Sequence, residues 1–403
     1  MRYDFVSFMD RHDRDAMAVD SIGRPGSFAP DAPQKGFDVI PMWVADMNFP
    51  TAPSITRALS ERIAHPAFGY FLPTGRYHDA IIDWHAHRNG VQGITPEMIG
   101  YENGVLGGLV SALHAFATPG DAVLVHSPTY IGFTHSLEGN GYKIVRSPLI
   151  RGTAGIWRLD LDDMDRKLKE HHCHVAILCS PHNPTGRVWS RGELEQAMEV
   201  FRDNDVIVIS DEIWSDIVLP GYHHIPTQSI SEDARMRTVA LYAPSKTFNL
   251  AGLVGGYHII QNPYLRDRVM SVSSKTHYNS MNVLSMHALI GAYSQEGADW
   301  VDELCQVIAG NVRFACDIIE SRFDGVDVSK PEGTYMLFLD CQRFCESHGM
   351  SIEQLRKAGW DVGVAWQDGC AFGGSHTIRM NLALPISRVK EAFRRLEEHV
   401  FLA

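Results

Sequence analysis

The fold class is indicated by three short aliphatic runs, HVAILCSP (174–181), VIVISDE (206–212) and TVALYAPSK (238–246). Each run is bounded by turn residues, which is typical of a parallel strand buried on both faces. A polar side chain ends or closely follows each run: Asn183, Asp211 and Lys246, respectively. Because ligands of open α/β sheets bind beyond the carboxyl ends of the strands, we expect an amide, a carboxylate and an amine at one rim.

Strand-like runs alternate with helical patterns along the chain, as in a mostly parallel sheet flanked by helices. Three further runs that we expect to form strands are at 121–130, 141–149 and 255–260. A helical period covers 301–323, and a strand-like run at 331–340 leads into a mixed pattern. We therefore predict an α/β fold with a large domain (50–285) and a smaller α+β domain formed by both chain ends (1–49 and 286–403).

The composition excludes several classes of protein. The 403-residue chain is 45% apolar and has a formal net charge of −12, whereas a nucleic-acid surface requires clustered Lys and Arg. There is no 18-residue apolar run and no basic-then-apolar N-terminus, so we expect no membrane span, no export signal and a cytoplasmic location. Seven cysteines without CxxC spacing are typical of reduced thiols.

One cluster, His171-His172-Cys173-His174, raises the question of a metal site. It joins an amphipathic helix to a strand that begins near Val175, so its side chains should diverge instead of sharing one face. We favour an exposed helix C-terminus, where histidine suits the helix dipole. We therefore predict no metal ligands in this chain.

The three polar groups at the predicted rim are those that pyridoxal 5′-phosphate (PLP) requires. Lys246 can form an imine with the cofactor aldehyde and later act as a base. Asp211 can keep the pyridine nitrogen protonated, which makes the ring a stronger electron sink. Asn183 can donate a hydrogen bond to the phenolate oxygen. Taken singly, these residues also fit ordinary roles, such as a helix cap or a turn residue.

Three more features are compatible with the same cofactor. Tyr130 can stack on the ring face, although a core tyrosine has the same pattern. The glycine-containing stretch that opens the apolar helix at 109–116 can bring backbone N–H groups to a phosphate. Arg379 lies in a strand-like run, and its planar fork can bind a carboxylate bidentately. An internal salt bridge is the alternative for this arginine.

In this ordered arrangement the chain resembles the fold-type-I PLP enzymes of the class I/II aminotransferase family, and more closely their MalY/PatB-type branch of cystathionine β-lyases or C–S lyases. The stretches that carry the resemblance occur in family order and span almost the whole chain. They are FMDRHDRDA (8–16), PMWVADMNFP (41–50), HPAFGYFLPTGRY (65–77), SPHNPTGRVW (180–189), SDEIWSDI (210–217), PSKTFNLAGL (244–253), PEGTYMLFLDC (331–341) and FGGSHTIRMNLALP (372–385).

The resemblance implies that Lys246 binds the cofactor covalently and that Arg379 binds the substrate α-carboxylate. Tyr70 resembles the tyrosine that reaches the phosphate of a neighbouring subunit, which implies a homodimer with two shared active sites. The cofactor-binding residues that we predict are Leu106, Gly107, Gly108, Tyr130, Asn183, Asp211, Trp214, Ser245, Lys246 and Tyr70. The predicted substrate-binding residues are Arg379, Ala45 and Asn183.

Four positions depart from the family pattern, and they bear on the phosphate site and on the substrate. Ala243 stands where many relatives have a phosphate-binding serine, and Val254 stands where transaminating relatives often have an arginine. Trp214 replaces a histidine that is common in the lyases, and Asn48 replaces an aspartate.

We expect α,β-elimination on a cystathionine-like sulfur amino acid, giving a thiol, pyruvate and ammonia. An aminotransferase acting on an L-amino acid is the alternative, because both reactions use the same electron sink at the substrate Cα. A specialised biosynthetic enzyme that uses the same chemistry also remains open. A non-catalytic PLP-binding or regulatory protein is disfavoured by the presence of Lys246, Asp211 and Arg379.

Overall fold

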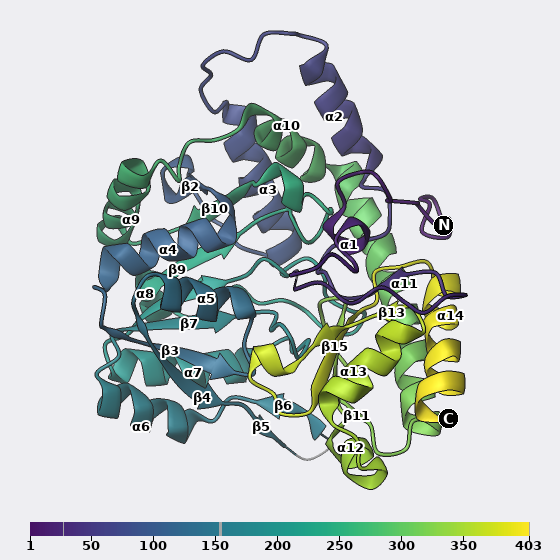
Figure 1. The fold of residues 1–403 in the computed structure, drawn as a ribbon. Coiled ribbons are helices and arrows are strands. Elements are labelled where there is room, and N and C mark those ends of the chain that lie inside the picture. The colour runs from purple at the N-terminus through teal and green to yellow at the C-terminus, as the bar shows by residue number, and fades with distance from the viewer. Residues whose placement is uncertain (27, 153–154, 403) are drawn as a thin grey trace.

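The computed structural model describes residues 1–26, 28–152 and 155–402. Its largest feature is a seven-stranded sheet, in which every strand is parallel to its neighbours except β10 (Figure 1). In spatial order the strands are β2 (Ile99–Glu102), β10 (Gly256–Ile259), β9 (Thr238–Tyr242), β8 (Ile207–Asp211), β7 (Val175–Cys179), β3 (Ala122–Ser127) and β4 (Lys143–Pro148). All six predicted strands of this sheet are confirmed, and β2 is an additional one.

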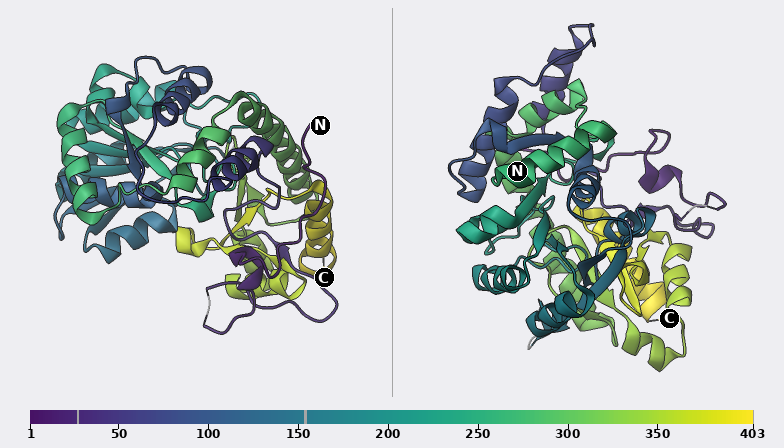
Figure 2. Two further views of the ribbon diagram at one scale, coloured as in Figure 1. Left: turned by 90° about the horizontal axis from the view of Figure 1, so that it is seen from above. Right: turned by 90° about the vertical axis from the view of Figure 1, so that its left-hand side faces the viewer.

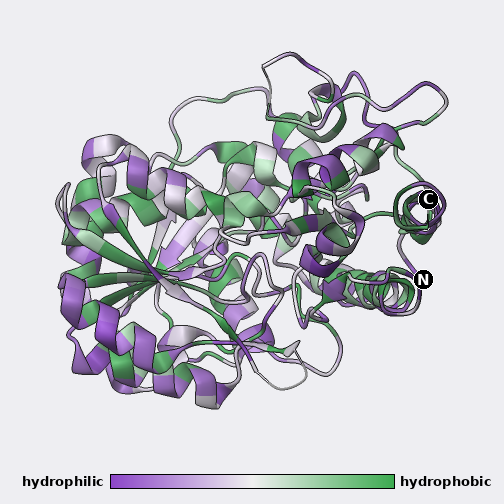
Figure 3. Ribbon diagram, turned by 60° about the horizontal axis from the view of Figure 1, so that its bottom comes forward, coloured by the Kyte–Doolittle hydropathy of each residue, from purple (hydrophilic) through white to green (hydrophobic). Residues whose placement is uncertain are grey.

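Helices cover both faces of this sheet because its central strands alternate large aliphatic side chains toward each face. Val175 and Ile177 pack with one set of helices, whereas Ala176 and Leu178 pack with the other. In Figure 3 the helices turn apolar residues toward the strands. The first set is α4 (Gly104–Phe116), α5 (Ile131–Gly139) and α9 (Pro263–Thr276), and the second is α6 (Leu161–His171), α7 (Arg191–Asp203) and α8 (Glu232–Arg237).

A second, four-stranded antiparallel sheet lies beside the first, on the side of the molecule where both chain termini are found (Figures 1 and 2). In spatial order its strands are β11 (Asp327–Val328), β12 (Met336–Asp340), β15 (Thr377–Asn381) and β14 (Gln367–Asp368). The accompanying helices are α11 (Gln295–Arg322), α12 (Gln342–His348), α13 (Ile352–Asp361) and α14 (Ile386–Leu396). The N-terminal segment joins this part through β1 (Ile40–Pro41), which pairs with β13 (Val364–Ala365). The exact domain boundaries stay a prediction.

The remaining α-helices and strands connect these two parts or lie at their edges. They are α1 (Met17–Asp20), α2 (Pro53–Ile63), α3 (Gly75–Asn89), α10 (Val283–Ala292) and the hairpin of β5 (Ile150–Arg151) and β6 (Trp157–Arg158). The loop between α2 and α3 projects away from the body of the molecule (Figures 1 and 2). Tyr70 in this loop is fully exposed. Within the described residues, no helix has both the length and the apolarity needed to cross a membrane.

Three predicted boundaries differ from the structure. The strand expected from residue 331 begins at Met336, because the preceding residues are irregular and Thr334 has a left-handed φ of 64°. Helix α11 begins at Gln295 instead of residue 301, since the Ser294 hydroxyl accepts a hydrogen bond from the Gly297 N–H at 3.2 Å. Helix α4 begins at Gly104, five residues earlier than expected.

The histidine cluster lies where the sequence predicts it. Helix α6 ends at His171, and His172 has a left-handed φ of 51° at the helix C-cap. Cys173 is buried in the core, whereas both histidines of the helix end are exposed. The seven cysteines are all free thiols, and six of them are buried.

Candidate active site

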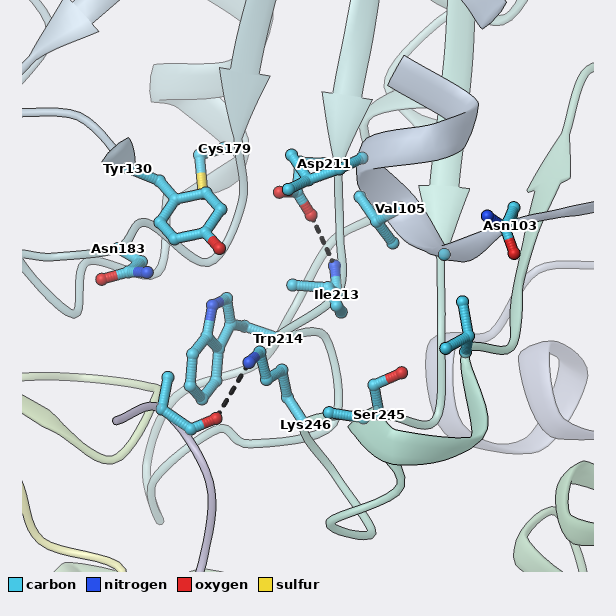
Figure 4. A pocket seen from close by; sticks show the side chains of 15 residues that line it. Asn103, Val105, Tyr130, Cys179, Asn183, Asp211, Ile213, Trp214, Ser245 and Lys246 are labelled. Atoms are coloured by element: carbon cyan, nitrogen blue, oxygen red, sulfur yellow. Dashed lines mark hydrogen bonds between the residues drawn. The ribbon is translucent and has the colours of Figure 1, made fainter. Parts of the chain in front are cut away.

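The carboxyl ends of β7, β8 and β9 border a cavity of about 190 Å³ (Figure 4). The parallel register pairs Cys179 of β7 with Asp211 of β8, so neighbouring strands end at the same level. The 15 lining residues include eight of the predicted cofactor- and substrate-binding residues. These eight are Ala45, Leu106, Tyr130, Asn183, Asp211, Trp214, Ser245 and Lys246.

Lys246 extends into the cavity from the turn that follows β9. Its Nζ donates a hydrogen bond to the Ala45 carbonyl oxygen at 2.9 Å and lies 5.9 Å from the centroid of the Trp214 ring. Burial, together with the positive charge of Arg379, lowers the pKa of this amine to about 8. At physiological pH the neutral fraction of Lys246 is therefore larger than that of an exposed lysine. An amine must be neutral to act as a nucleophile.

Asp211 is the last residue of β8 and is buried beside the cavity. Its carboxylate accepts one hydrogen bond, from the Ile213 N–H at 3.0 Å (Figure 4), and forms no ion pair with any described residue. Burial raises the pKa of this carboxyl group to about 7. A buried acid without a cationic partner is suited to an added positive group, such as the protonated nitrogen of a pyridine ring.

Arg379 lies on β15 of the four-stranded sheet and does not line the cavity, but it contacts a residue that does. Its Nη1 donates to Asn183 Oδ1 at 3.2 Å, and its Nη2 donates to the Trp43 carbonyl oxygen at 3.0 Å and to Gln367 Oε1. The side chain is buried, which lowers its pKa to about 10, so it remains charged at neutral pH.

The turn that carries Asn183 is held against the segment leading to β12. Gly186 has a φ of 71°, and a Cβ atom on it would lie 2.4 Å from Pro331 Cβ, so only glycine fits. The Gly186 carbonyl oxygen accepts hydrogen bonds from the N–H groups of Glu332 and Gly333, at 2.8 and 2.9 Å. This packing brings Asn183 and Arg379 together although 196 residues separate them.

The N-terminus of α4 forms another wall of the cavity. Gly104, Val105 and Leu106 line it, and the N-cap residue Asn103 makes no side-chain hydrogen bond to the helix. The first backbone N–H groups of a helix have no intrahelical partner, and together with the helix dipole they attract an anion. This wall therefore suits the phosphate of a cofactor.

Besides Arg379, three predicted site residues lie outside the cavity lining: Gly107, Gly108 and Tyr70. Gly108 allows close packing with the sheet, because a Cβ atom there would lie 2.8 Å from Leu241 Cδ2. Gly107 is adjacent to the lining residue Leu106, and Tyr70 lies on the projecting loop. Within a single chain, none of these three residues lines the cavity.

The loop at 43–47 is held over the cavity by contacts that were not predicted from the sequence. Asn381 Nδ2 donates to the Val44 carbonyl oxygen at 2.7 Å and also to the Asp46 carbonyl oxygen. Tyr335 Oη donates to the Ala45 carbonyl oxygen at 3.1 Å. Asn381 lies in the stretch FGGSHTIRMNLALP and Tyr335 lies in PEGTYMLFLDC. Because both stretches carry the family resemblance, they were the signal by which these two residues could have been found. The seven other lining residues were not among the predicted binding residues: Asn103, Gly104, Val105, Cys179, Ile213, Ala251 and Val254.

The fold and the donor set together define a class of protein. An amine with a lowered pKa, a buried carboxylate without a cation and a free helix N-terminus border one cavity and fit the aldehyde, ring nitrogen and phosphate of PLP. The mostly parallel seven-stranded sheet, with the lysine directly after β9, fits the expected fold-type-I PLP-dependent enzyme.

Comparison with known proteins identifies the family. The model of the family "Aminotransferase class I and II" matches residues 38–396. Cystathionine beta-lyase PatB of Bacillus subtilis is 35% identical over 363 residues, covering 89% of this chain and 92% of the relative. Protein MalY of Escherichia coli is 30% identical over 394 residues, covering 96% of each. Cystalysin from Treponema denticola, whose crystal structure contains PLP, has a TM-score of 0.90 at 29% identity and 99% coverage of both chains.

The chain therefore belongs to the class I and II aminotransferase family and groups with its PatB- and MalY-like C–S lyase branch. It is a PLP-dependent enzyme that is similar to C–S lyases of this family, and PLP is its cofactor.

Proposed function

We propose that this enzyme is a C–S β-lyase that eliminates a thiol from a cystathionine-like L-amino acid, with pyruvate and ammonia as the other products. The observation that carries the proposal is the position of Lys246, a buried amine with a pKa lowered to about 8, in one cavity with the Asp211 carboxylate. The similarity to cystathionine beta-lyase PatB and to the C–S lyase from Staphylococcus hominis supports elimination as the outcome.

The residues around the cavity would hold PLP by complementary chemistry. Lys246 would bind the aldehyde, the Asp211 carboxylate would keep the ring nitrogen protonated, and the N-terminus of α4 would receive the phosphate. When bound, PLP supplies an aldehyde that captures the substrate amine and a ring that accepts electrons from the substrate Cα.

The proton transfers and the orientation of the substrate fall to side chains of this chain. Arg379, with Asn183 beside it, would bind the α-carboxylate and so fix which bond at Cα faces Lys246. The neutral amine of Lys246 would remove the Cα proton, and general base catalysis of this kind contributes about 10²–10⁴-fold. The C–S bond at Cβ then breaks, and the electron pair leaves with the sulfur as a thiolate.

We also propose that two copies of the chain form shared active sites. Among the lining residues of the cavity, Lys246 is the only cation within the described part of the chain, so the phosphate has no arginine there. Tyr70 is fully exposed on the projecting loop between α2 and α3, where it could contact another subunit. Light scattering of wild type and of a Tyr70→Ala variant, combined with PLP titration, would test this arrangement: weaker PLP binding without loss of the dimer is expected.

The substrate proposal is tested with the purified holoenzyme and L-cystathionine. We expect equimolar pyruvate and free thiol, and no turnover by the matched Lys246→Ala variant. Intact PLP-bound enzyme that releases no pyruvate from L-cystathionine or from a cysteine S-conjugate would overturn the proposal. Conversion of an amino-acid donor into its keto acid, with formation of the pyridoxamine form of the cofactor, would instead establish an aminotransferase.

A further inference from the structure

Arg379 is a buried cation for which the chain supplies only neutral partners. Its hydrogen-bond acceptors are Asn183 Oδ1, the Trp43 carbonyl oxygen and Gln367 Oε1. The Phe372 ring lies 4.5 Å from its guanidinium carbon. Among the described residues no Asp or Glu pairs with it, and its Nε has no hydrogen-bond partner. The positive charge therefore remains available to an anion from outside the protein.

Gln367 is placed to orient this cation. It lies on β14, directly opposite Arg379 on β15 in the antiparallel register, so the two Cα atoms are partners. The Oε1 atom of Gln367 accepts a hydrogen bond from Arg379 Nη2. The same Nη2 also donates to the Trp43 carbonyl oxygen, so two acceptors fix the plane of the guanidinium group.

A glutamate at position 367 would have nearly the same shape as the glutamine, but its charge would neutralise Arg379. A carboxylate beside a buried guanidinium forms an ion pair in which both groups are charged, whereas a neutral amide accepts a hydrogen bond from the cation without compensating its charge. Such a pair would satisfy Arg379 internally and would compete with a carboxylate that arrives with the substrate. An amide keeps the directional hydrogen bond and adds no negative charge.

We propose that Gln367 is a positioning residue that makes the site selective for substrates with a free α-carboxylate, because it orients Arg379 without neutralising it. This inference rests on the proposed role of Arg379 in binding the substrate carboxylate. It goes further by assigning the selectivity to a neutral residue outside the PLP cavity.

The test compares two ligands that differ only in the carboxylate, L-alanine and ethylamine, with the holoenzyme. Binding is measured from the absorbance change of the bound cofactor. We expect Gln367→Glu to weaken the binding of L-alanine by about 10- to 100-fold, the range of one charge-assisted hydrogen bond. The affinity for ethylamine should change by no more than about twofold. Gln367→Leu, which removes the acceptor without adding charge, should weaken L-alanine by less than Gln367→Glu does.

Gln354→Glu is the matched control, since it makes the same chemical change on the surface of the same part of the molecule. Gln354 is exposed in the capping box of α13, a position where a glutamate serves equally well. The Gln354→Glu variant should bind L-alanine and ethylamine with unchanged affinity. The inference is overturned if Gln367→Glu affects L-alanine by less than twofold, if it weakens both ligands equally, or if Gln367→Leu weakens L-alanine as much as Gln367→Glu. Because L-alanine has no leaving group, these results do not depend on whether the enzyme eliminates thiols.

Discussion

Lys246 Nζ donates a hydrogen bond to the Ala45 carbonyl oxygen at 2.9 Å, although 201 residues separate the two positions in sequence. The same carbonyl oxygen accepts the Tyr335 hydroxyl at 3.1 Å. The N-terminal loop therefore encloses the lysine that follows β9, and this enclosure contributes to the burial that lowers the lysine pKa.

The lowered pKa predicts when Lys246 reacts. In the cofactor-free protein only the neutral amine is nucleophilic, so labelling of Lys246 should rise with pH through about 8 and level off above it. At pH 8 its neutral fraction should exceed that of an ordinary lysine by roughly 100-fold. Mass spectrometry after amine labelling between pH 6 and 11 measures this profile, with exposed Lys357 as the internal control. Lys357 pairs with Asp361 at 2.7 Å, which raises its pKa. Identical profiles for the two lysines would contradict the prediction.

Asp211 should destabilise the cofactor-free protein at neutral and alkaline pH. Its pKa is raised by burial to about 7 from the ordinary value of 3.8, so the folded state holds its proton more tightly than the unfolded state. This tighter proton binding contributes to the free energy of unfolding below about pH 4, and the contribution is lost as the pH rises to about 7. We expect Asp211→Asn to raise the unfolding free energy of the cofactor-free protein by roughly 1–4 kcal/mol at pH 8. Denaturant unfolding at pH 5 and pH 8 measures it, and an Asn variant that gains nothing at pH 8 would contradict it.

Glu332 joins the turn that carries Asn183 to the segment before β12. Its carboxylate contacts Arg187 and accepts the Val188 N–H at 3.0 Å, while both charged side chains are largely buried. Glu332→Ala leaves the N–H unsatisfied and removes one of the two acids that pair with Arg187. We expect a loss of about 2–4 kcal/mol in the free energy of unfolding.

An exposed acid of the neighbouring helix gives the control for that variant. Glu320 on α11 pairs with Lys330 at 3.3 Å, and both side chains are more than half exposed. Glu320→Ala should change the free energy of unfolding by less than about 0.5 kcal/mol. Thermal unfolding of the two variants with saturating PLP measures the difference, and equal effects would show that the buried pair has no special role.

Val254 stores backbone strain at the edge of the cavity. It has a left-handed φ of 48°, a conformation that a β-branched residue rarely adopts, and its carbonyl oxygen accepts the Tyr101 hydroxyl at 2.7 Å. Asparagine tolerates this conformation, so Val254→Asn should stabilise the cofactor-free protein by about 1 kcal/mol. Denaturant midpoints of wild type and variant test this. A destabilised variant would mean that packing of the valine side chain outweighs the strain.

The sequence alone predicted six of the seven strands of the large sheet and the convergence of Asn183, Asp211 and Lys246. The six runs are continuous aliphatic segments bounded by turn residues, and the carboxyl ends of parallel strands reach the same rim. The proposed place of the phosphate also comes from the sequence, because a glycine-containing helix start provides free N–H groups, as every helix N-terminus does. Gly108 shows the limit of that signal, since its lack of a side chain serves packing against Leu241.

The tertiary structure decided the contacts that tune these groups. The Ala45 carbonyl oxygen, Tyr335 and Gln367 reach the site from segments that lie far from Lys246 and Asn183 in the chain. Periodicity and turn chemistry are local properties of a sequence, whereas burial and the pKa shifts that it causes arise from many segments packed together. That is why the identities of the reactive groups could be predicted from the chain, while their charge states and the neutral surroundings of Arg379 could not.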